Sequence, residues 1–324
     1  MDTFERKEAK YLLSPLQYIQ FRALADRHLA QAEHHETDIC SAYYDTPDNT
    51  LAERTLREAR FKENLRVRSY NGPVSESGPG TPVFIEVKRK FKDTTSKRRI
   101  SCTAAAARAF LSGMDYEQAI GRWPLAGADA QTAGCSPRST QIAGEISWMA
   151  AHYPDLAPKM EVASHRLSFA GAADPALRVT FDDDVRWRTA DGAWRSLFAH
   201  GERILEVKCQ QAMPLWLVEA LSACGAKPMS ASKYGLAYQA CSAGRRSAMQ
   251  TTARARVGGR TPQDTGRAAK SEPGSGVSGG NHARARSHAA SALSLQPRRN
   301  SLVASIHALI GRALGPKPAH AAHR

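Results

Sequence analysis

Alternation of apolar and charged residues is the clearest pattern in this chain. In the stretch 84–90, FIEVKRK, Ile85 and Val87 alternate with Glu86 and Lys88. A period of two residues is typical of a β-strand, whose successive side chains point to opposite faces of a sheet. The pattern therefore predicts a strand with one apolar face suited to a core and one charged face.

The charged half of this pattern occurs in three further stretches. On a single strand, such a face would simply be solvated. Four strands of one domain that share the pattern suggest a curled sheet whose charged faces converge. Because a basic interior is costly unless an anion fills it, we expect an anion to bind there. The four charged pairs are Glu8 with Lys10, Arg66 with Arg68, Glu86 with Lys88, and Glu206 with Lys208.

The remaining hydrophobic pattern divides the chain into further strands and helices. Pro15 is expected to start the first helix, with Leu16, Ile19 and Leu24 on its apolar face, and Asp48 to cap the second. Regular helices do not separate all of the strands, which favours an α+β fold, a mostly antiparallel barrel with helices packed outside. The expected strands are 4–13, 37–46, 63–70, 84–91, 96–102, 159–170, 177–188 and 203–211, and the expected helices are 15–30, 48–60, 103–113, 139–152, 214–225 and one that begins at 230.

Composition changes near residue 244. Residues 245–324 hold 14 lysines and arginines against two acids, which accounts for +12 of the net charge of +14. We expect residues 1–244 to form the folded domain, 245–300 a disordered basic linker and 301–324 a tail. Residues 301–314 carry an apolar helical face that suits a membrane surface or a partner, although a transient helix without function is as good an interpretation. The basic region is either merely solvated or binds nucleic acid or polyphosphate weakly.

The same composition argues against several classes of protein. No run of 18 apolar residues predicts a transmembrane helix, and the charged N-terminus lacks the apolar region of a signal peptide. The six cysteines show neither a CxxC motif nor even spacing, so they predict reduced thiols rather than a disulfide framework or a zinc site. We therefore expect a cytoplasmic protein.

Eight short motifs, in order along residues 4–242, resemble one protein family. The chain resembles the VTC domain, which is the polyphosphate polymerase domain of the vacuolar transporter chaperone complex, in its stand-alone bacterial form. This family belongs to the triphosphate tunnel metalloenzymes, also called CYTH-like proteins. The motifs are RKEAKYLLS at 6–14, SAYYDTPD at 41–48, LRVRSY at 65–70, FIEVKRKF at 84–91, SKRRI at 96–100, LRVTFDDDV at 177–185, ILEVK at 204–208 and SKYGLAY at 232–238.

The resemblance implies an eight-stranded antiparallel tunnel that binds triphosphate groups and a divalent metal, Mn²⁺ or Mg²⁺. In the polymerases of this family, the γ-phosphate of ATP passes to a growing polyphosphate chain. Carried over motif by motif, the catalytic contacts fall on Arg66, Arg68, Lys88, Arg166 and Arg178. Further phosphate contacts fall on Lys10, Lys97, Arg99, Ser232 and Lys233, and the metal carboxylate is Glu206.

These residue types suit a metal-dependent phosphotransferase. An arginine pairs two phosphate oxygens at once, and a lysine supplies a point charge. Phosphoryl transfer needs in-line positioning and cancellation of charge more than covalent help from the protein. Mg²⁺ and Mn²⁺ prefer oxygen ligands, which suits Glu206. Glu8, Glu86 and Asp182 are weaker metal candidates and are expected mainly to orient basic neighbours.

Two features keep the function open. Ser164 stands where the family usually has a tyrosine, two residues before Arg166. The run Asp182–Asp184 looks like a metal cluster, but three consecutive strand residues cannot share one face. Three functions therefore remain, namely a polyphosphate-synthesising transferase, a triphosphate or polyphosphate hydrolase, and a non-catalytic module that binds ATP or polyphosphate. A tunnel open at both ends would favour the first, because a growing chain could leave through it.

Overall fold

The computed structural model describes residues 7–57, 59–70, 72–92, 94–127, 136–190, 192–230 and 232–244. The chain divides into one unit over Met1–Thr261 and a second over Pro262–Arg324, and all described residues belong to the first. The basic region 245–324 and its amphipathic segment 301–314 lie outside the described residues. The domain boundary at residue 244 and the character of the tail therefore stay predictions.

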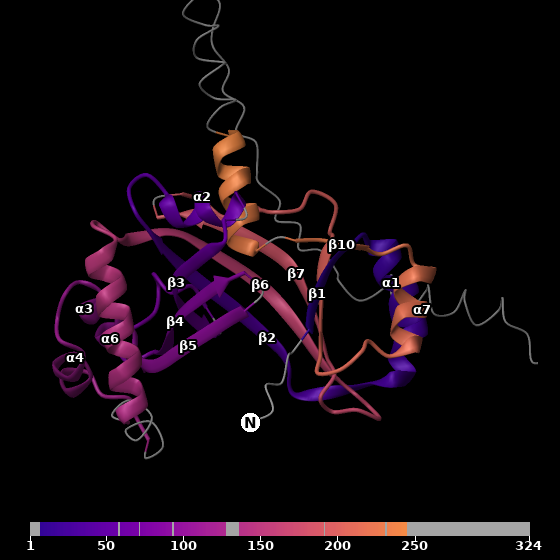
Figure 1. Ribbon diagram of the computed structural model, residues 1–324, viewed down its shortest axis with the longest axis horizontal. Coiled ribbons are helices and arrows are strands. Elements are labelled where there is room, and N and C mark those ends of the chain that lie inside the picture. Colours follow the sequence, from indigo (N-terminus) through magenta and orange to yellow (C-terminus); the bar gives the residue numbers. More distant parts are fainter. Residues whose placement is uncertain are drawn as a thin grey trace, which may run out of the picture. The chain divides into compact units, whose positions relative to one another are not determined.

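One antiparallel sheet dominates the described part of the chain (Figure 1). Its long strands correspond to the eight expected from the sequence, while the two-residue strands β8 and β10 were not predicted. The hydrogen-bonded order is β10-β1-β9-β7-β6-β2-β3-β4-β5, with β8 beside β7. The strands are β1 (Lys7–Leu13), β2 (Leu29–Asp45), β3 (Phe61–Tyr70), β4 (Pro82–Phe91), β5 (Thr94–Thr103), β6 (Ala157–Gly171), β7 (Arg178–Thr189), β8 (Arg195–Ser196), β9 (Arg203–Cys209) and β10 (Lys227–Pro228).

The sheet curls, so that its two ends face each other. Partial desolvation lowers the pKa of Lys88 on β4, and the next influences on it are the charges of Glu8 and Lys10 on β1, near the opposite end of the strand order. The α+β class and the antiparallel arrangement are thus confirmed. Among the described residues, no strand pairing joins β5 to β1 or β10. The hydrogen bonds between these strands therefore do not close the predicted tunnel, and the structure shows only that the charged faces converge.

Two groups of helices cover the face of the sheet that lies opposite these charges. In Figure 1, α3, α4 and α6 lie beside β3, β4 and β5, whereas α1 and α7 lie together near β1. The helices are α1 (Pro15–Ala25), α2 (Thr50–Leu56), α3 (Ala104–Leu111), α4 (Tyr116–Arg122), α6 (Pro137–His152) and α7 (Leu215–Ala223), followed by a last helix over residues 233–244. No helix in this part of the chain combines the length and hydropathy needed to cross a membrane.

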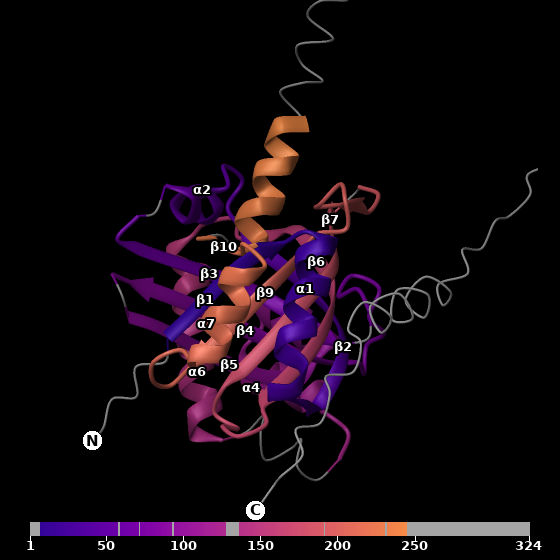
Figure 2. The ribbon, with the colours of Figure 1, turned by 90° about the vertical axis from the view of Figure 1, so that its right-hand side faces the viewer.

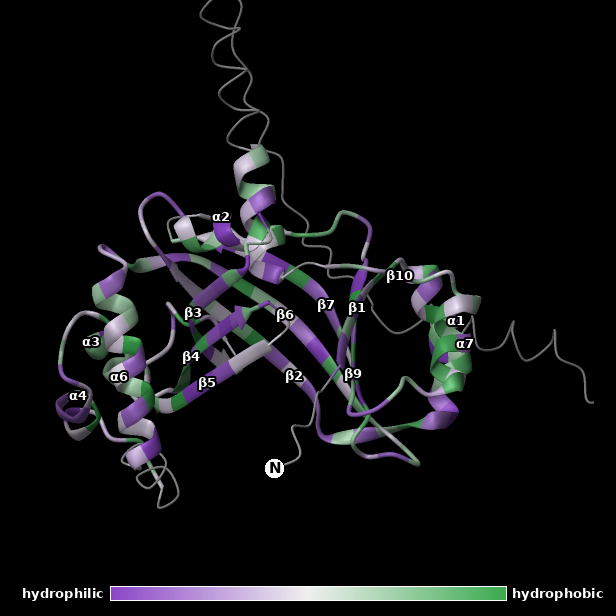
Figure 3. Cartoon of the chain, viewed as in Figure 1, coloured by the Kyte–Doolittle hydropathy of each residue, from purple (hydrophilic) through white to green (hydrophobic). Residues whose placement is uncertain are grey.

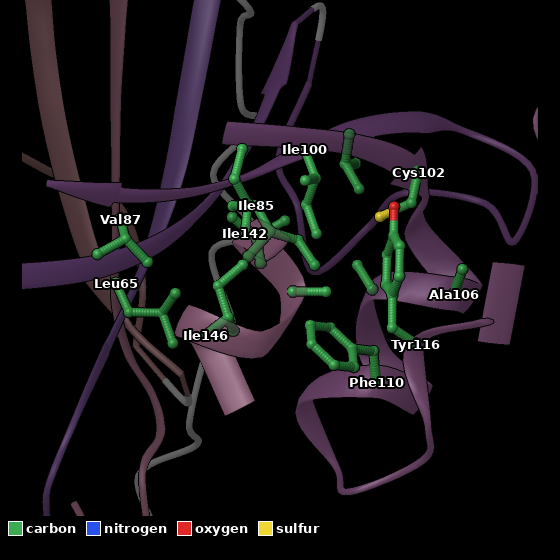
Figure 4. Packing of buried hydrophobic residues seen from close by; sticks show 14 of the residues in the cluster. Leu65, Ile85, Val87, Ile100, Cys102, Ala106, Phe110, Tyr116, Ile142 and Ile146 are labelled. Carbon is green, nitrogen blue, oxygen red and sulfur yellow. The ribbon is translucent and has the colours of Figure 1, made fainter. Parts of the chain in front are cut away.

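The apolar half of the alternating pattern forms the core under α3, α4 and α6. Leu65, Ile85 and Val87 are buried and point toward Ile142 and Ile146 of α6 (Figure 4). Stripes of opposite hydropathy along β3 and β4 show the same alternation (Figure 3). Burying these side chains stabilises the fold by roughly 1.5–3 kcal/mol each. The charged residues of the same strands consequently point to the other face, which we call the inner face.

A second core lies under α1 and α7, and here the predicted helix face was wrong. Leu16 is 64% exposed, whereas Phe21 and Ala25 are fully buried. Phe21 packs edge-on against Phe181 of β7, with ring centroids 5.8 Å apart. The helix also ends at Ala25, because the chain turns through the 3₁₀ segment Asp26–His28 and enters β2 at Leu29, eight positions before the predicted start of that strand.

The cap of α2 also differs from the prediction. The carboxylate of Asp45, at the end of β2, accepts hydrogen bonds from the backbone N–H groups of Leu51 and Ala52, each at 2.9 Å. Asp48 instead accepts from the hydroxyls of Thr46 and Thr50. Asp45 lies six residues before Leu51, further from the helix than the N-cap position, so the usual capping pattern does not reveal this contact.

A third core lies on the inner face itself, at one end of the sheet. The last helix and α2 pack there against strand residues that share a face with the charged side chains. We call this set the inner apolar layer. Its members are Tyr43, Ala52, Met160, Val162, Val185, Trp187, Ile204, Tyr234, Ala237 and Cys241.

Candidate functional site

The structure brings the predicted site residues together on the inner face. The pairing registers align Arg66 with Glu86 and Lys10 with Glu206, and strand alternation carries the same face along each strand. Ser232 and Lys233 enter from the start of the last helix, where the Ser232 hydroxyl accepts from the N–H of Gly235. The predicted residues on strands are Lys10, Arg66, Arg68, Lys88, Lys97, Arg99, Arg166, Arg178 and Glu206.

Glu86 organises the first group of charges. Its side chain is 1% exposed and lies 2.6 Å from Arg66, 2.7 Å from Lys97 and 3.8 Å from Arg68. Burial alone would raise the pKa of Glu86, but these cations hold it at about 2. Arg66 also donates to the hydroxyl of Tyr43 at 3.0 Å. Glu86 is therefore ionised and orients its basic neighbours, as the sequence suggested.

Asp182 organises the second group. Arg166 donates to both oxygens of Asp182, at 2.7 and 2.8 Å, and the Nζ of Lys233 lies 3.0 Å from the same carboxylate. Lys233 also donates to the hydroxyl of Ser164 at 2.6 Å. Burial lowers the pKa of Lys233 to about 8, in spite of Asp182. Ser164, which stands in place of the tyrosine usual in the family, thus holds Lys233.

The neighbours of Asp182 point elsewhere, but alternation accounts only for Asp183, because Asp182 and Asp184 would share a face on a regular strand. Asp184 has a φ of 45°, and the pairing of β6 with β7 shifts at this point. Asp183 contacts His165 at 2.9 Å, and Asp184 pairs with Arg186 at 3.2 Å. This irregularity turns the next residues of β7 inward, where Val185 and Trp187 join the inner apolar layer.

Glu206 organises the third group. It pairs with Lys208, and its other oxygen lies 3.6 Å from Lys10, which also pairs with Glu8. Burial would raise the pKa of Glu206, but Lys208, Lys10 and Arg166 hold it at about 2. The carboxylate is therefore ionised at neutral pH.

The oxygen atoms around Glu206 fit a divalent metal that arrives with phosphate. Thr180 lies directly opposite Glu206, and its hydroxyl oxygen is buried without a hydrogen-bond partner among the described residues. In the part of the chain that the structure describes, no group of three or more His, Cys, Asp or Glu forms a protein-only site. Mg²⁺ commonly takes one or two carboxylates and completes its shell with phosphate oxygens and water. Glu206 and Thr180 match that incomplete donor set.

Three predicted cations have no carboxylate partner. Lys88, Arg99 and Arg178 are exposed, and none of them forms an ion pair with another described residue. Arg99 lies over the ring of Phe84, 4.7 Å from its centroid. The inner face therefore combines basic groups fixed by buried acids with basic groups that are available to an added anion.

The sequence also left out residues that belong to this site. Tyr43 was not among the predicted site residues, yet its hydroxyl accepts from Arg66 and its ring stacks on Tyr234 of the last helix, with ring centroids 4.4 Å apart. Lys208 was seen in the alternating pattern but not assigned, although it is the nearest cation to Glu206. The alternating pattern alone was enough to place Lys208 on the same strand face as Glu206. The role of Tyr43 depends on a contact with a distant helix, which no local pattern contains.

Comparisons with known proteins give one family and distant structures. The profile of the VTC domain matches residues 5–242, and no curated protein sequence matches the chain. A Vibrio parahaemolyticus protein described as a candidate adenylate cyclase has 11% identity and a TM-score of 0.31, over 68% of this chain and 83% of its own. A Pyrococcus horikoshii OT3 protein has 11% identity and a TM-score of 0.32, over 71% of this chain and 98% of its own. Because the family profile spans most of the sequence, the chain belongs to the VTC domain family.

Proposed function

We propose that this protein is a metal-dependent phosphotransferase that moves the γ-phosphate of ATP onto a polyphosphate chain. Membership of the VTC family implies chemistry on triphosphate or polyphosphate. The observation that carries the proposal is the inner face, where Arg66, Arg166 and Lys233 are fixed by the buried acids Glu86 and Asp182. Positive charge held in place beforehand is what a phosphoryl group needs as its charge redistributes.

Each group of side chains has a task in this proposal. Arg66 and Arg166 present fixed guanidinium groups, which suit paired oxygens of one phosphate. The exposed Lys88 and Arg178 neutralise further phosphates. Glu206 and Thr180 would hold the metal, which would supply positive charge to offset that of the phosphates. The acceptor is itself an anionic phosphate oxygen, so the transfer needs positioning more than a protein base.

One observation supports hydrolysis as a second candidate. The inner apolar layer covers the inner face at one end of β2, β6, β7 and β9. A growing chain cannot pass over packed apolar side chains without loss of their burial. If this were the only route outward, short products and water as the acceptor would be favoured. A non-catalytic module that binds ATP or polyphosphate is the third alternative, and we propose the cytoplasm, where ATP is available, as the location for all three.

The reaction products distinguish these functions. The full chain is incubated with ATP and Mn²⁺, and the products are separated on a gel that resolves phosphate chains. We expect ADP together with chains longer than a triphosphate. Glu206→Gln should still bind nucleotide but lose most turnover, because the neutral amide is a poor metal ligand while the basic groups remain.

The other outcomes assign the alternatives. Free phosphate or tripolyphosphate as the main product would make the protein a hydrolase. Bound but unchanged ATP would make it a binding module. Full turnover by Glu206→Gln would remove Glu206 from the site and contradict the assignment of the metal ligand.

A further inference from the structure

The inner face is covered at one end but not across its whole width. The inner apolar layer draws its strand residues from β2, β6, β7 and β9, and Leu12 of β1 packs against it. The layer contains no residue of β3, β4 or β5. At this end of the sheet α2 reaches β3, where the amide of Asn64 donates to the hydroxyl of Thr55 at 3.5 Å. The route from the buried arginines to solvent therefore lies mainly over β4 and β5.

Lysines line that route. Continuing past Glu86, the inner face of β3, β4 and β5 carries Lys88 directly opposite Lys97, and then Lys62 directly opposite Lys90. We call these four residues the lysine ladder. Its two rungs lie two residues apart along the strands, which is about 7 Å.

Three of the four lysines in the ladder have no ion-pair partner among the described residues. Lys97 lies 2.7 Å from Glu86, but Lys62, Lys88 and Lys90 form no ion pair with any described residue. Like charges directly opposite each other on neighbouring strands destabilise a sheet. The arrangement therefore costs stability in the free protein, and an anion placed along it would remove that cost.

The ladder is continuous with the proposed site and leads outward. Lys97 shares the carboxylate of Glu86 with Arg66, so its first rung touches the cluster of fixed charges. Lys88 and Lys90 are exposed, as is the hairpin end of β4 and β5. Figure 2 shows these strand ends projecting at the left, with the last helix at the top.

We propose that the lysine ladder binds the phosphates of a linear polyphosphate chain that lie beyond those held at the site of transfer. This inference rests on the proposed function and names the path by which a chain enters or leaves. A chain on this path would run beside the inner apolar layer and would not displace its packed side chains.

Inorganic polyphosphate fits this path better than single-stranded nucleic acid. Proteins that bind single strands without sequence preference stack bases on aromatic side chains beside a basic groove. The aromatic residues at these strand ends, Phe61 and Phe91, lie on the opposite face of the sheet, and Phe61 lines a hollow there with Trp148 of α6. On the inner face of these strands, the described aromatic residues Phe84 and Tyr70 lie on the other side of Glu86 and pack edge-on against each other. Among the described residues, the ladder therefore offers charge without an adjacent stacking partner.

The test compares short and long chains in the full-length protein. Affinities for inorganic tripolyphosphate, for long-chain polyphosphate and for a single-stranded oligonucleotide are measured at several salt concentrations. The variant is Lys62→Ala with Lys90→Ala, since neither residue belongs to the proposed catalytic contacts. The matched control is Lys7→Ala with Lys159→Ala, which removes the same charge from the opposite face of the sheet.

We expect the ladder variant to keep the wild-type affinity for tripolyphosphate and to bind long chains about fivefold more weakly, as expected for two exposed charge contacts. The slope of log K against log salt for long chains should become shallower by about 1.4, if polyphosphate behaves like other single-stranded polyanions. The control pair should change neither quantity. Melting temperatures of variant and control no lower than that of the wild type would show that both remain folded, and the ladder variant should melt at the same or a higher temperature.

The contrary results separate this inference from the proposed function. If wild-type protein fails to bind tripolyphosphate, both the proposed function and the ladder are wrong. If tripolyphosphate binds but long chains bind equally well to wild type and ladder variant, the ladder alone is wrong. Loss of oligonucleotide binding without loss of polyphosphate binding would also overturn it, in favour of a nucleic-acid path.

Discussion

Each buried acid of the inner face holds at least one basic side chain in a fixed place. Glu86 and Asp182 are both 1% exposed, and their oxygens contact Arg66, Lys97, Arg166 and Lys233. Ion pairs of this kind contribute little net stability, because desolvation offsets their attraction. Their consequence is geometric, since the arginine forks are oriented before any phosphate binds.

Asp182→Asn tests this positioning role. The substitution leaves Arg166 and Lys233 without their shared anion, so the free energy of unfolding should fall by about 3 kcal/mol. Saturating tripolyphosphate should recover part of that loss, because it supplies anionic oxygens to the same cations. Thermal melting with and without the ligand measures both effects. Asp183→Asn, on the other face, is the control, and an equal effect of the two variants would contradict the role of Asp182.

Lys88 and Arg66 should respond to alanine in opposite ways. Lys88 faces Lys97 and has no ion pair among the described residues. Lys88→Ala should therefore leave the free energy of unfolding unchanged or raise it by up to about 1 kcal/mol. Arg66 compensates the buried Glu86, so Arg66→Ala should lower stability by about 2 kcal/mol. Calorimetry should show weaker tripolyphosphate binding for both. Destabilisation by Lys88→Ala with unchanged binding would make Lys88 a structural residue.

Lys233 makes anion binding depend on pH. Its pKa of about 8 lies below that of a solvated lysine, so a fraction of the free protein carries a neutral amine above pH 8. A bound anion favours the charged form, so tripolyphosphate binding at about pH 8.5 should take up protons and weaken as pH rises. Titration calorimetry in two buffers of different ionisation enthalpy measures the uptake. Lys233→Arg should reduce it, and an unchanged uptake would assign the proton to another group.

The last helix connects the fold to the site. Tyr234 is buried in the inner apolar layer, stacks on Tyr43 and donates to Asp45 at 2.7 Å, while Lys233 at the helix start reaches Asp182. The same element therefore covers one end of the inner face and supplies one of its cations. Its removal should affect packing and binding together.

Two truncations test this connection. A chain that ends at residue 244 keeps the last helix and should melt and bind tripolyphosphate like the full-length protein. A chain that ends at residue 231 loses Tyr234 and Ala237 from the inner apolar layer, and should lose at least about 3 kcal/mol of stability together with most tripolyphosphate affinity. Circular dichroism melting and calorimetry measure the two effects. Unfolding of the longer truncation product would place the domain boundary beyond residue 244.

The elements predictable from the sequence are those whose pattern is local. Alternation in FIEVKRKF and LRVRSY placed β3 and β4 with the correct faces, because one face is buried under α6 and the other is charged. The long N-terminal half of β2 and the buried face of α1 were missed. In both segments few residues are buried, and their burial depends on contacts with other elements. Local hydropathy therefore carried little information about them.

At the scale of the whole domain, the convergence of charged faces was predictable from the sequence, but the apolar layer that limits the charged surface was not. Four alternating stretches indicated a curled sheet, and the influence of Glu8 and Lys10 on Lys88 agrees with that prediction. The inner apolar layer was not predicted, because its residues come from strands, from α2 and from the last helix, and only their contacts show a common face. The lysine ladder likewise needs the pairing of β3 with β4.

The most direct test of the account follows a labelled phosphate. The full-length protein is incubated with Mn²⁺, ATP labelled at the γ-phosphate and an unlabelled polyphosphate of defined length, and the label is located after separation by chain length. Transfer of the γ-phosphate to polyphosphate predicts label in chains longer than the added acceptor, with an equal amount of ADP, and little transfer by Arg66→Ala. Label recovered only as free phosphate or tripolyphosphate, or left entirely in ATP, would contradict it.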